Sequence, residues 1–192
     1  MKARIAAVAV LLLILAGCGT TGGSQQGQGD EERTQKMNMQ EAAERADAIL
    51  DGTFAAIKPP VEWTHRDSMP GDCTTDRKRS VMTIVSAERR GGFLGLVERY
   101  WKSEGFKFRA TSQDKQAAYY MTPDGFQVSV KFGWKGQAHF EVTTPCVEKA
   151  EVSDPTSKSN GPDYSGRELP APNVHSDFWS ANTPVSGASP SA

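Results

Sequence analysis

The stretch QAAYYMTPDGFQVSVKFGWKGQAHFEVTT, residues 116–144, decides the fold. In two parts of this stretch apolar side chains occupy every second position, which is typical of strands with one buried face. These alternating positions are Phe126, Val128, Val130 and Phe132, and then Ala138, Phe140, Val142 and Thr144. The turn residues at 122–125 and 135–136 separate the parts and favour hairpins. The stretch therefore predicts successive antiparallel strands over residues 116–121, 126–132 and 138–144.

Two helices and two more strands are predicted upstream of this stretch. Apolar residues recur every three or four positions over residues 37–57 and again from Phe93 to Trp101, as in amphipathic helices. Gly105 follows the second helix, where a left-handed cap is expected. The additional strands cover residues 79–87 and 106–111. The order α-β-α-β-β-β-β predicts a single α+β domain over residues 37–149, with two helices packed on one face of a four- to five-stranded antiparallel sheet.

Two polar parts of this domain are expected to lie outside the core. Residues 61–72 are interpreted as irregular, with Trp63 packing over the edge of the core. The basic clusters 77–79 and 89–90 could contact anionic lipid headgroups, but we interpret them as a solvated strand end and a turn.

Two cysteines, Cys73 and Cys146, flank the strands of the domain. We expect a disulfide between them, which requires the first strand and the last strand to be antiparallel neighbours. A redox thiol pair normally has Cys-x-x-Cys spacing, which is absent. A zinc site is also disfavoured, because the three histidines show no paired ligand spacing with these cysteines.

The N-terminus carries a basic start, an apolar run from Ile5 to Ala16, and the sequence Leu-Ala-Gly-Cys at 15–18. This end closely resembles the lipobox of bacterial lipoproteins. The resemblance implies cleavage of a signal peptide, residues 1–17, and attachment of a diacylglycerol to Cys18. Residues 18–36 then form the lipidated end and a flexible tether, because they contain no large apolar side chain.

Other interpretations of the N-terminus are weaker. The apolar run is shorter than the about 20 residues that a membrane-spanning helix needs. Secretion in soluble form, with Cys18 incidental, is the remaining alternative. The chain has a formal net charge of −1 and becomes more acidic when Lys2 and Arg4 are removed with the signal. It therefore has no general attraction for nucleic acid.

Residues 150–192 form a tail rich in proline, serine, asparagine and glycine, for which disorder is expected. Within this tail, Phe178 and Trp179 form an adjacent aromatic pair. The pair could be a docking motif for a partner, or the segment could pack back on the domain.

No catalytic motif is found in the sequence. It has no nucleophile elbow and no phosphate-binding loop, and neither a metal nor a cofactor is expected. His139 and Glu141 fall on the same face of the last strand, which permits a surface hydrogen bond but does not establish an acid–base pair.

Exposed aromatic side chains are the better candidates for a site. Tyr119 and Tyr120 must face opposite sides of their strand, and Trp134 falls at a turn, so Tyr119 and Trp134 are candidate binding residues together with Phe178 and Trp179. In layout and composition the chain also resembles small actinobacterial cell-envelope lipoproteins of unassigned activity. We expect a membrane-anchored extracytoplasmic module that binds an envelope protein or glycan. The alternative is an envelope hydrolase or transferase whose site is assembled from distant residues.

Overall fold

The computed structural model describes residues 37–164 and 167–184. The predicted signal peptide, Cys18 and the tether therefore lie outside the described residues. Within the described ranges, none of the helices is both long enough and apolar enough to cross a membrane.

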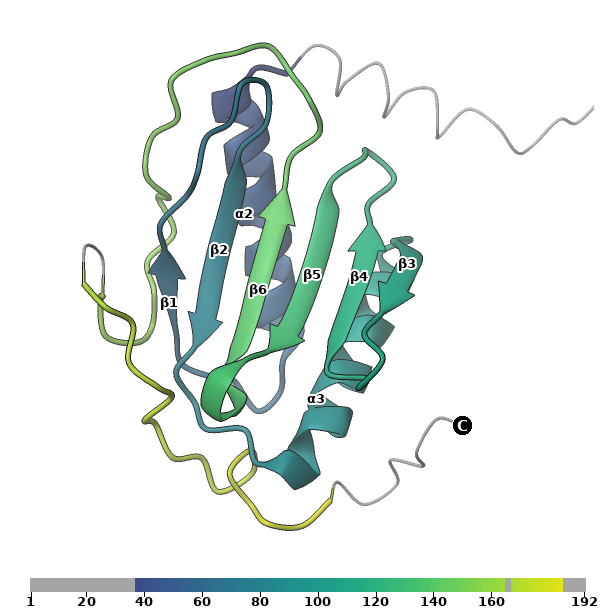
Figure 1. Cartoon of the computed structure of the whole chain (residues 1–192), viewed down its shortest axis with the longest axis vertical. Coiled ribbons are helices and arrows are strands. Elements are labelled where there is room, and N and C mark those ends of the chain that lie inside the picture. Colours follow the sequence, from purple (N-terminus) through teal and green to yellow (C-terminus); the bar gives the residue numbers. More distant parts are fainter. Residues whose placement is uncertain (1–36, 165–166, 185–192) are drawn as a thin grey trace, which may run out of the picture.

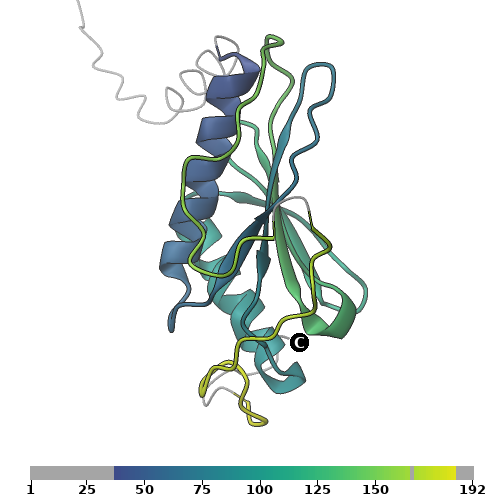
Figure 2. The same cartoon turned by 90° about the vertical axis from the view of Figure 1, so that its left-hand side faces the viewer.

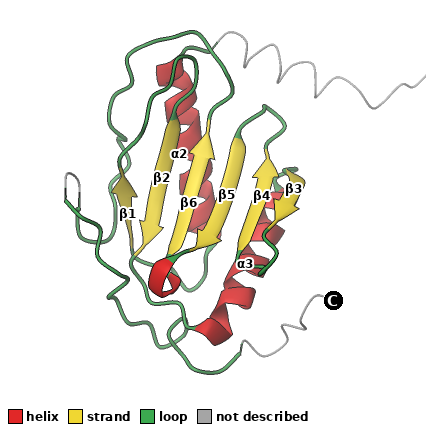
Figure 3. Ribbon diagram, viewed as in Figure 1, coloured by secondary structure: helices red, strands yellow, loops and turns green. Residues whose placement is uncertain are grey.

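The domain has two layers, with two helices on one face of an antiparallel sheet (Figures 1 and 2). The helices are α2 (Met39–Ala56) and α3 (Ala87–Ser103). The six strands are β1 (Trp63–Arg66), β2 (Asp76–Val81), β3 (Lys107–Thr111), β4 (Ala117–Met121), β5 (Gln127–Phe132) and β6 (Ala138–Thr143). They follow the order β1-β2-β6-β5-β4-β3 (Figure 3), so the predicted α+β class with helices packed against the sheet is confirmed.

Both helices bury their apolar faces against the same strands. Phe54 of α2 and Phe93 of α3 each contact Phe140 of β6, with ring centroids 4.8 and 6.1 Å apart. A capping box begins α2, because the Asn38 side chain accepts from the Glu41 amide while the Glu41 carboxylate accepts from the Asn38 amide. The core therefore lies between the helices and one face of the sheet.

The predicted strand count is too low because β1 was interpreted as irregular chain. This strand has only four residues, Trp-Thr-His-Arg, and pairs antiparallel with β2. Its outward positions are polar and a Pro-Pro pair precedes it closely, so the usual signals of a strand are weak.

The strand predicted over residues 79–87 is displaced in the structure. It begins at Asp76 and ends at Val81, after which the chain forms only an isolated bridge from Thr83 to Val174 before α3 begins. The earlier start places Arg77 and Arg79 on the helix-covered face, where they are 2% and 0% exposed. The interpretation of this basic cluster as a solvated strand end is therefore wrong.

Helix α3 begins at Ala87, six residues before the predicted start at Phe93. Its first turns contain charged residues and two glycines, which conceal the helical period in the sequence. Gly105 after the helix has a φ of 77°, which confirms the predicted left-handed cap.

The predicted disulfide is present, with the Cα atoms of Cys73 and Cys146 4.8 Å apart. It joins the chain before β2 to the chain after β6. These two strands are antiparallel neighbours, as the sequence predicted.

The described part of the C-terminal segment, residues 150–164 and 167–184, packs on the domain, and we call it the strap (Figures 1 and 2). It lines the outer edge of β1, where the Trp63 amide donates to the Asn160 side chain and the Gly161 amide donates to the Trp63 carbonyl. Near its end, Trp179 is 1% exposed and its indole donates to the Pro59 carbonyl over 2.8 Å. The expected disorder therefore does not apply to the strap, which is held by hydrogen bonds that mostly join a side chain to a backbone group, and composition does not reveal such contacts.

Candidate functional site

The face of the sheet opposite the helices carries polar side chains in register across three strands. Tyr119 of β4 pairs with Ser129 of β5, which pairs with Glu141 of β6. In the next row, Gln127 pairs with Thr143. Because successive side chains alternate between faces, these residues point away from the buried row formed by Val128, Val130, Phe140 and Val142.

This open face is hollowed into a groove of about 280 Å³ over strands β3 to β6. We call it the sheet groove. Its lining includes Arg109, Tyr119, Gln127, Ser129, Lys131, Glu141 and Thr143. The strands hold the positions of these side chains, so the groove is largely pre-formed.

Most polar side chains of the sheet groove have no partner among the described residues. Those of Arg109, Tyr119, Gln127, Ser129 and Thr143 form no hydrogen bond or ion pair with another residue of the described ranges. Lys131 and Glu141 form only a loose ion pair, with Nζ and Oε2 3.9 Å apart. Donors, acceptors and one phenol ring therefore remain available to a ligand in this groove.

Arg109 of β3 lies beside the groove, at a break in strand pairing. The register between β3 and β4 shifts between Phe108 and Ala110, so Arg109 is the extra residue of a bulge. Phe108 pairs with Tyr120, so regular alternation from Phe108 already points Arg109 to the face that carries Tyr119. Sequence reasoning missed Arg109, because the pairing of β3 with β4 that brings it beside Tyr119 is not encoded in the local sequence.

The structure separates the four aromatic residues predicted as binding candidates. Tyr119 is 40% exposed and lines the sheet groove, whereas Trp134 is 70% exposed but lies in the turn between β5 and β6, against the ammonium of Lys135. Phe178 is half-buried under the guanidinium of Arg89. Trp179 is buried, so the aromatic pair packs back on the domain, which was the other interpretation of this segment.

On the open face of the sheet, opposite the helices, His139 and Ser80 form a hydrogen-bonded pair, with Nδ1 of His139 and Oγ of Ser80 2.7 Å apart. Burial, reinforced by the positive charges of Arg66 and Lys131, lowers the pKa of His139 to about 4. The imidazole is therefore neutral at pH 7, but Ser80 is 0% exposed and its hydroxyl is out of reach of a substrate. The geometry fits a structural hydrogen bond better than an activated nucleophile.

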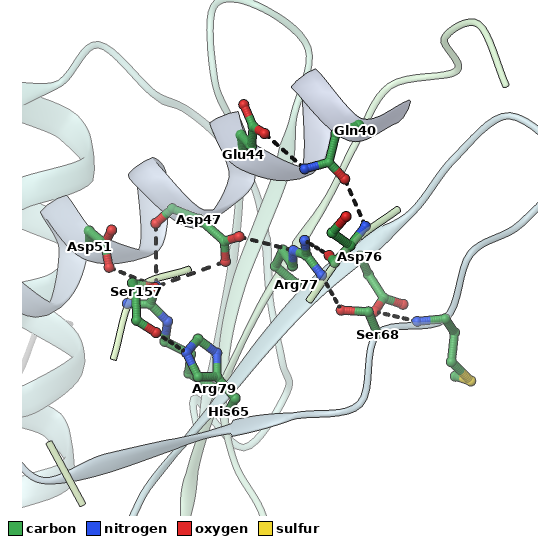
Figure 4. A network of polar contacts seen from close by, with 12 residues as sticks. Gln40, Glu44, Asp47, Asp51, His65, Ser68, Asp76, Arg77, Arg79 and Ser157 are labelled. Carbon is green, nitrogen blue, oxygen red and sulfur yellow. Dashed lines mark hydrogen bonds and ion pairs between the residues drawn. The ribbon is translucent and has the colours of Figure 1, made fainter. Parts of the chain in front are cut away.

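A second polar cluster, under the helix layer, joins α2, β2 and the strap (Figure 4). Nε of Arg77 lies 3.0 Å from Oδ2 of Asp47, and Nη2 of Arg79 lies 2.7 Å from Oδ1 of Asp51. The strap contributes Ser157, whose hydroxyl lies 2.9 Å from Nη2 of Arg79. We call these five residues the arginine cluster.

Burial dominates the electrostatics of the arginine cluster. It raises the pKa of the Asp47 carboxyl, an effect that the charges of Arg77 and Arg79 only partly offset. Burial also lowers the pKa of Arg79, against the opposing effect of Asp51. The Arg79 guanidinium additionally lies 4.1 Å from the ring centroid of Trp63. Since its charged groups already bind one another, this cluster fits a structural role.

A further hollow of about 350 Å³ lies between β1 and the strap. Its lining includes Arg66 and Lys78, together with Tyr164 and Arg167 of the strap. The last two flank residues 165–166, which are outside the described ranges.

Among the described residues, no group of three or more histidine, cysteine, aspartate and glutamate side chains is arranged to hold a metal ion.

Comparison with known proteins adds little to this geometry. No protein-family model matches the chain, and no curated protein matches it in sequence. Among solved structures, a DUF4853 family protein from Actinomyces odontolyticus is similar at 12% identity and a TM-score of 0.29, over 73% of this chain and 76% of that one. The class of the protein is therefore defined by its own fold, a two-layer α+β domain with an open, grooved sheet face.

Proposed function

We propose that this chain is a lipoprotein, anchored through Cys18 on the extracytoplasmic face of the cell membrane, that acts as a binding module of the cell envelope. The observation that carries the binding role is the sheet groove. Around an exposed tyrosine ring it presents hydrogen-bonding side chains that no other described residue engages.

A rigid sheet is a suitable support for such a site. Neighbouring strands fix the spacing of side chains, so little conformational entropy is lost when a ligand binds. The helix layer covers the opposite face, which leaves the groove face as the accessible side of the sheet (Figure 2).

The lipid anchor rests on the lipobox at 15–18. Two acyl chains hold a protein on a membrane stably where one chain gives only marginal binding. Residues 18–36, whose composition predicts a flexible coil, would let the domain reach neighbouring components of the envelope.

The hydrolase or transferase alternative gains no support from the site geometry. Its best candidate pair is Ser80 and His139, and the serine hydroxyl is buried beneath the open face. A nucleophile has to reach its substrate in a near-attack geometry.

Site-specific photocrosslinking in intact cells tests the binding role. A photoreactive residue replaces Ser129 in the groove, and a matched control replaces Arg99, which is exposed on α3 on the helix side. We expect a discrete crosslinked species from position 129 and none from position 99. Equal labelling at both positions, or none at either, would contradict the proposed site.

Membrane fractionation tests the anchor separately. The wild-type chain is expected in the membrane fraction, and a Cys18→Ser variant in the soluble extracytoplasmic fraction. If both proteins fractionate identically, attachment through Cys18 is wrong, whatever the result of crosslinking.

A further inference from the structure

We propose that the ligand of the sheet groove is a carboxylate-bearing glycan, which Arg109 and Lys131 recognise through its negative charge. This inference rests on the proposed function and specifies the chemistry of its ligand.

The cations of the sheet differ in whether their charge is already matched. Arg77 and Arg79 pair with Asp47 and Asp51 in the arginine cluster. Lys78 pairs with Asp76 over 2.8 Å. These pairs leave no strong attraction for an external anion.

In contrast, the sheet groove holds cationic charge that is not matched. The Arg109 side chain forms no ion pair or hydrogen bond with another residue of the described ranges, and Lys131 is only loosely paired with Glu141 at 3.9 Å. A guanidinium presents its donors in a planar fork that matches both oxygens of a carboxylate. The free Arg109 is therefore the natural recognition group for a carboxylate.

The rest of the groove favours a sugar as the carrier of that charge. The partly exposed ring of Tyr119 offers an apolar surface to the C–H face of a pyranose, with a hydroxyl at its tip. The side chains of Gln127, Ser129 and Thr143 supply short-range donors and acceptors for sugar hydroxyls.

An extended acidic peptide is the main competing ligand, and the edge of the sheet argues against it. Such a peptide would add a strand along β3, the edge strand beside the groove. The bulge at Arg109 interrupts the regular hydrogen-bonding edge there, and Lys107 lies on the same strand. Bulges and lysines are features that block strand addition.

Calorimetric titration of the full-length lipoprotein in lipid nanodiscs tests this inference. The first probe is tetragalacturonate. Its methyl ester has the same sugars without the negative charge, and a tetraglutamate peptide has the negative charge without the sugars. We expect the uronate to bind at least about tenfold more tightly than its ester, with affinity falling as salt is added.

Two variants identify the groups responsible. Arg109→Gln is expected to weaken uronate binding about tenfold and to leave ester binding unchanged, because a charge-assisted hydrogen bond is lost. The matched control Arg99→Gln removes an exposed arginine outside the groove and should change the affinity for neither the uronate nor the ester. Tyr119→Ala is expected to weaken both sugars, whereas Trp134→Ala should weaken neither.

The outcomes separate the ligand chemistry from the proposed function. Equal binding of uronate and ester, with loss of both in Tyr119→Ala, would overturn the role of charge and keep a glycan-binding groove. Tighter binding of tetraglutamate than of uronate would overturn the glycan. If no probe binds while position 129 still crosslinks in cells, this inference fails and the proposed function stands. Failure of both experiments would reject both.

Discussion

Arg79 shows how a single residue can connect three parts of the fold. It lies on β2 without exposed surface, bonded to Asp51 of α2 and to Ser157 of the strap. It also lies near the buried carboxyl of Asp47, with Nη2 and Oδ1 3.9 Å apart. Removing Arg79 takes away its hydrogen bonds to Asp51 and Ser157 and its packing against the Trp63 ring, whereas Asp47 keeps its pairing with Arg77.

We predict that Arg79→Ala lowers the free energy of unfolding by about 2–3 kcal/mol. Urea denaturation monitored by tryptophan fluorescence measures the change. Arg66→Ala is the matched control, because Arg66 is exposed on the neighbouring strand, and its effect should stay within about 0.5 kcal/mol. Similar small effects in both variants would mean that burial of Arg79 contributes little.

His139 is predicted to make stability depend on pH. Its pKa is about 4 in the folded chain, below the ordinary value of 6.5 for a histidine, mainly because the ring is buried. Between these two values the unfolded chain binds more protons than the folded chain, so stability is lost as the pH falls through this window.

Comparison of urea unfolding at pH 7 and at pH 4.5 tests this dependence. Between pH 7 and pH 4.5 the free energy of unfolding of the wild type should fall by up to about 3 kcal/mol more than that of His139→Gln. Identical losses in the two proteins would show that carboxylates alone, and not His139, set the acid sensitivity.

At the scale of elements, the strap completes both the sheet edge and the core. Its residues Asn160 and Gly161 satisfy backbone groups of Trp63 on β1. Farther along, the ring of Trp179 meets Phe93 of α3 at 5.1 Å between centroids. The strap is thus a structural part of the domain.

Trp179→Ala is predicted to lower the free energy of unfolding by about 3–5 kcal/mol, because it leaves a cavity and an unpaired Pro59 carbonyl. Phe178→Ala removes a neighbouring aromatic ring that is only half-buried, and a decrease of about 1–2 kcal/mol is expected. Thermal and urea unfolding of the two variants give the comparison. A larger effect for Phe178→Ala would contradict the packing of the strap.

The elements differ in how well their sequences predict them. Strands β5 and β6 alternate regularly between apolar and polar residues, so the period gives both their positions and their buried faces. Strand β1 is short and β2 buries two arginines, so the hydrophobic pattern does not predict the position of either strand. The packing of the strap was not predicted for a different reason, because its contacts depend on backbone groups and on one tryptophan.

The candidate site was predictable only in part for related reasons. Alternation identifies Tyr119 as an outward-facing residue, and the structure places it in the sheet groove. Arg109 joins it only through the pairing of β3 with β4, and the groove combines four strands whose order the sequence left partly open. Register across strands is a long-range property that local patterns do not encode.

At the scale of the whole molecule, the Cys73–Cys146 bond joins two positions 73 residues apart in the chain. In the chain-entropy model a loop of this length contributes about 4 kcal/mol, chiefly by restricting the unfolded state. We predict that a Cys73→Ser/Cys146→Ser variant loses this amount of unfolding free energy. Urea titration with and without reductant measures it, and the variant should not respond to reductant. An unchanged midpoint for the reduced wild-type protein would be the contrary result.

The contact between the start of α2 and the end of the sheet has a mechanical consequence. The Met39 amide donates to the carbonyl of Glu148, close to the cysteine that is bonded to the chain before β2. A tension applied through the residues that precede α2 would therefore pass into the β2 and β6 pair, and would not simply peel the helix away. The opposite edge of the sheet, at β3 and β4, lies away from the β2 and β6 pair that would carry this tension (Figure 1). A pull on the residues that precede α2 would thus leave the part of the groove beside Arg109 and Tyr119 under little strain.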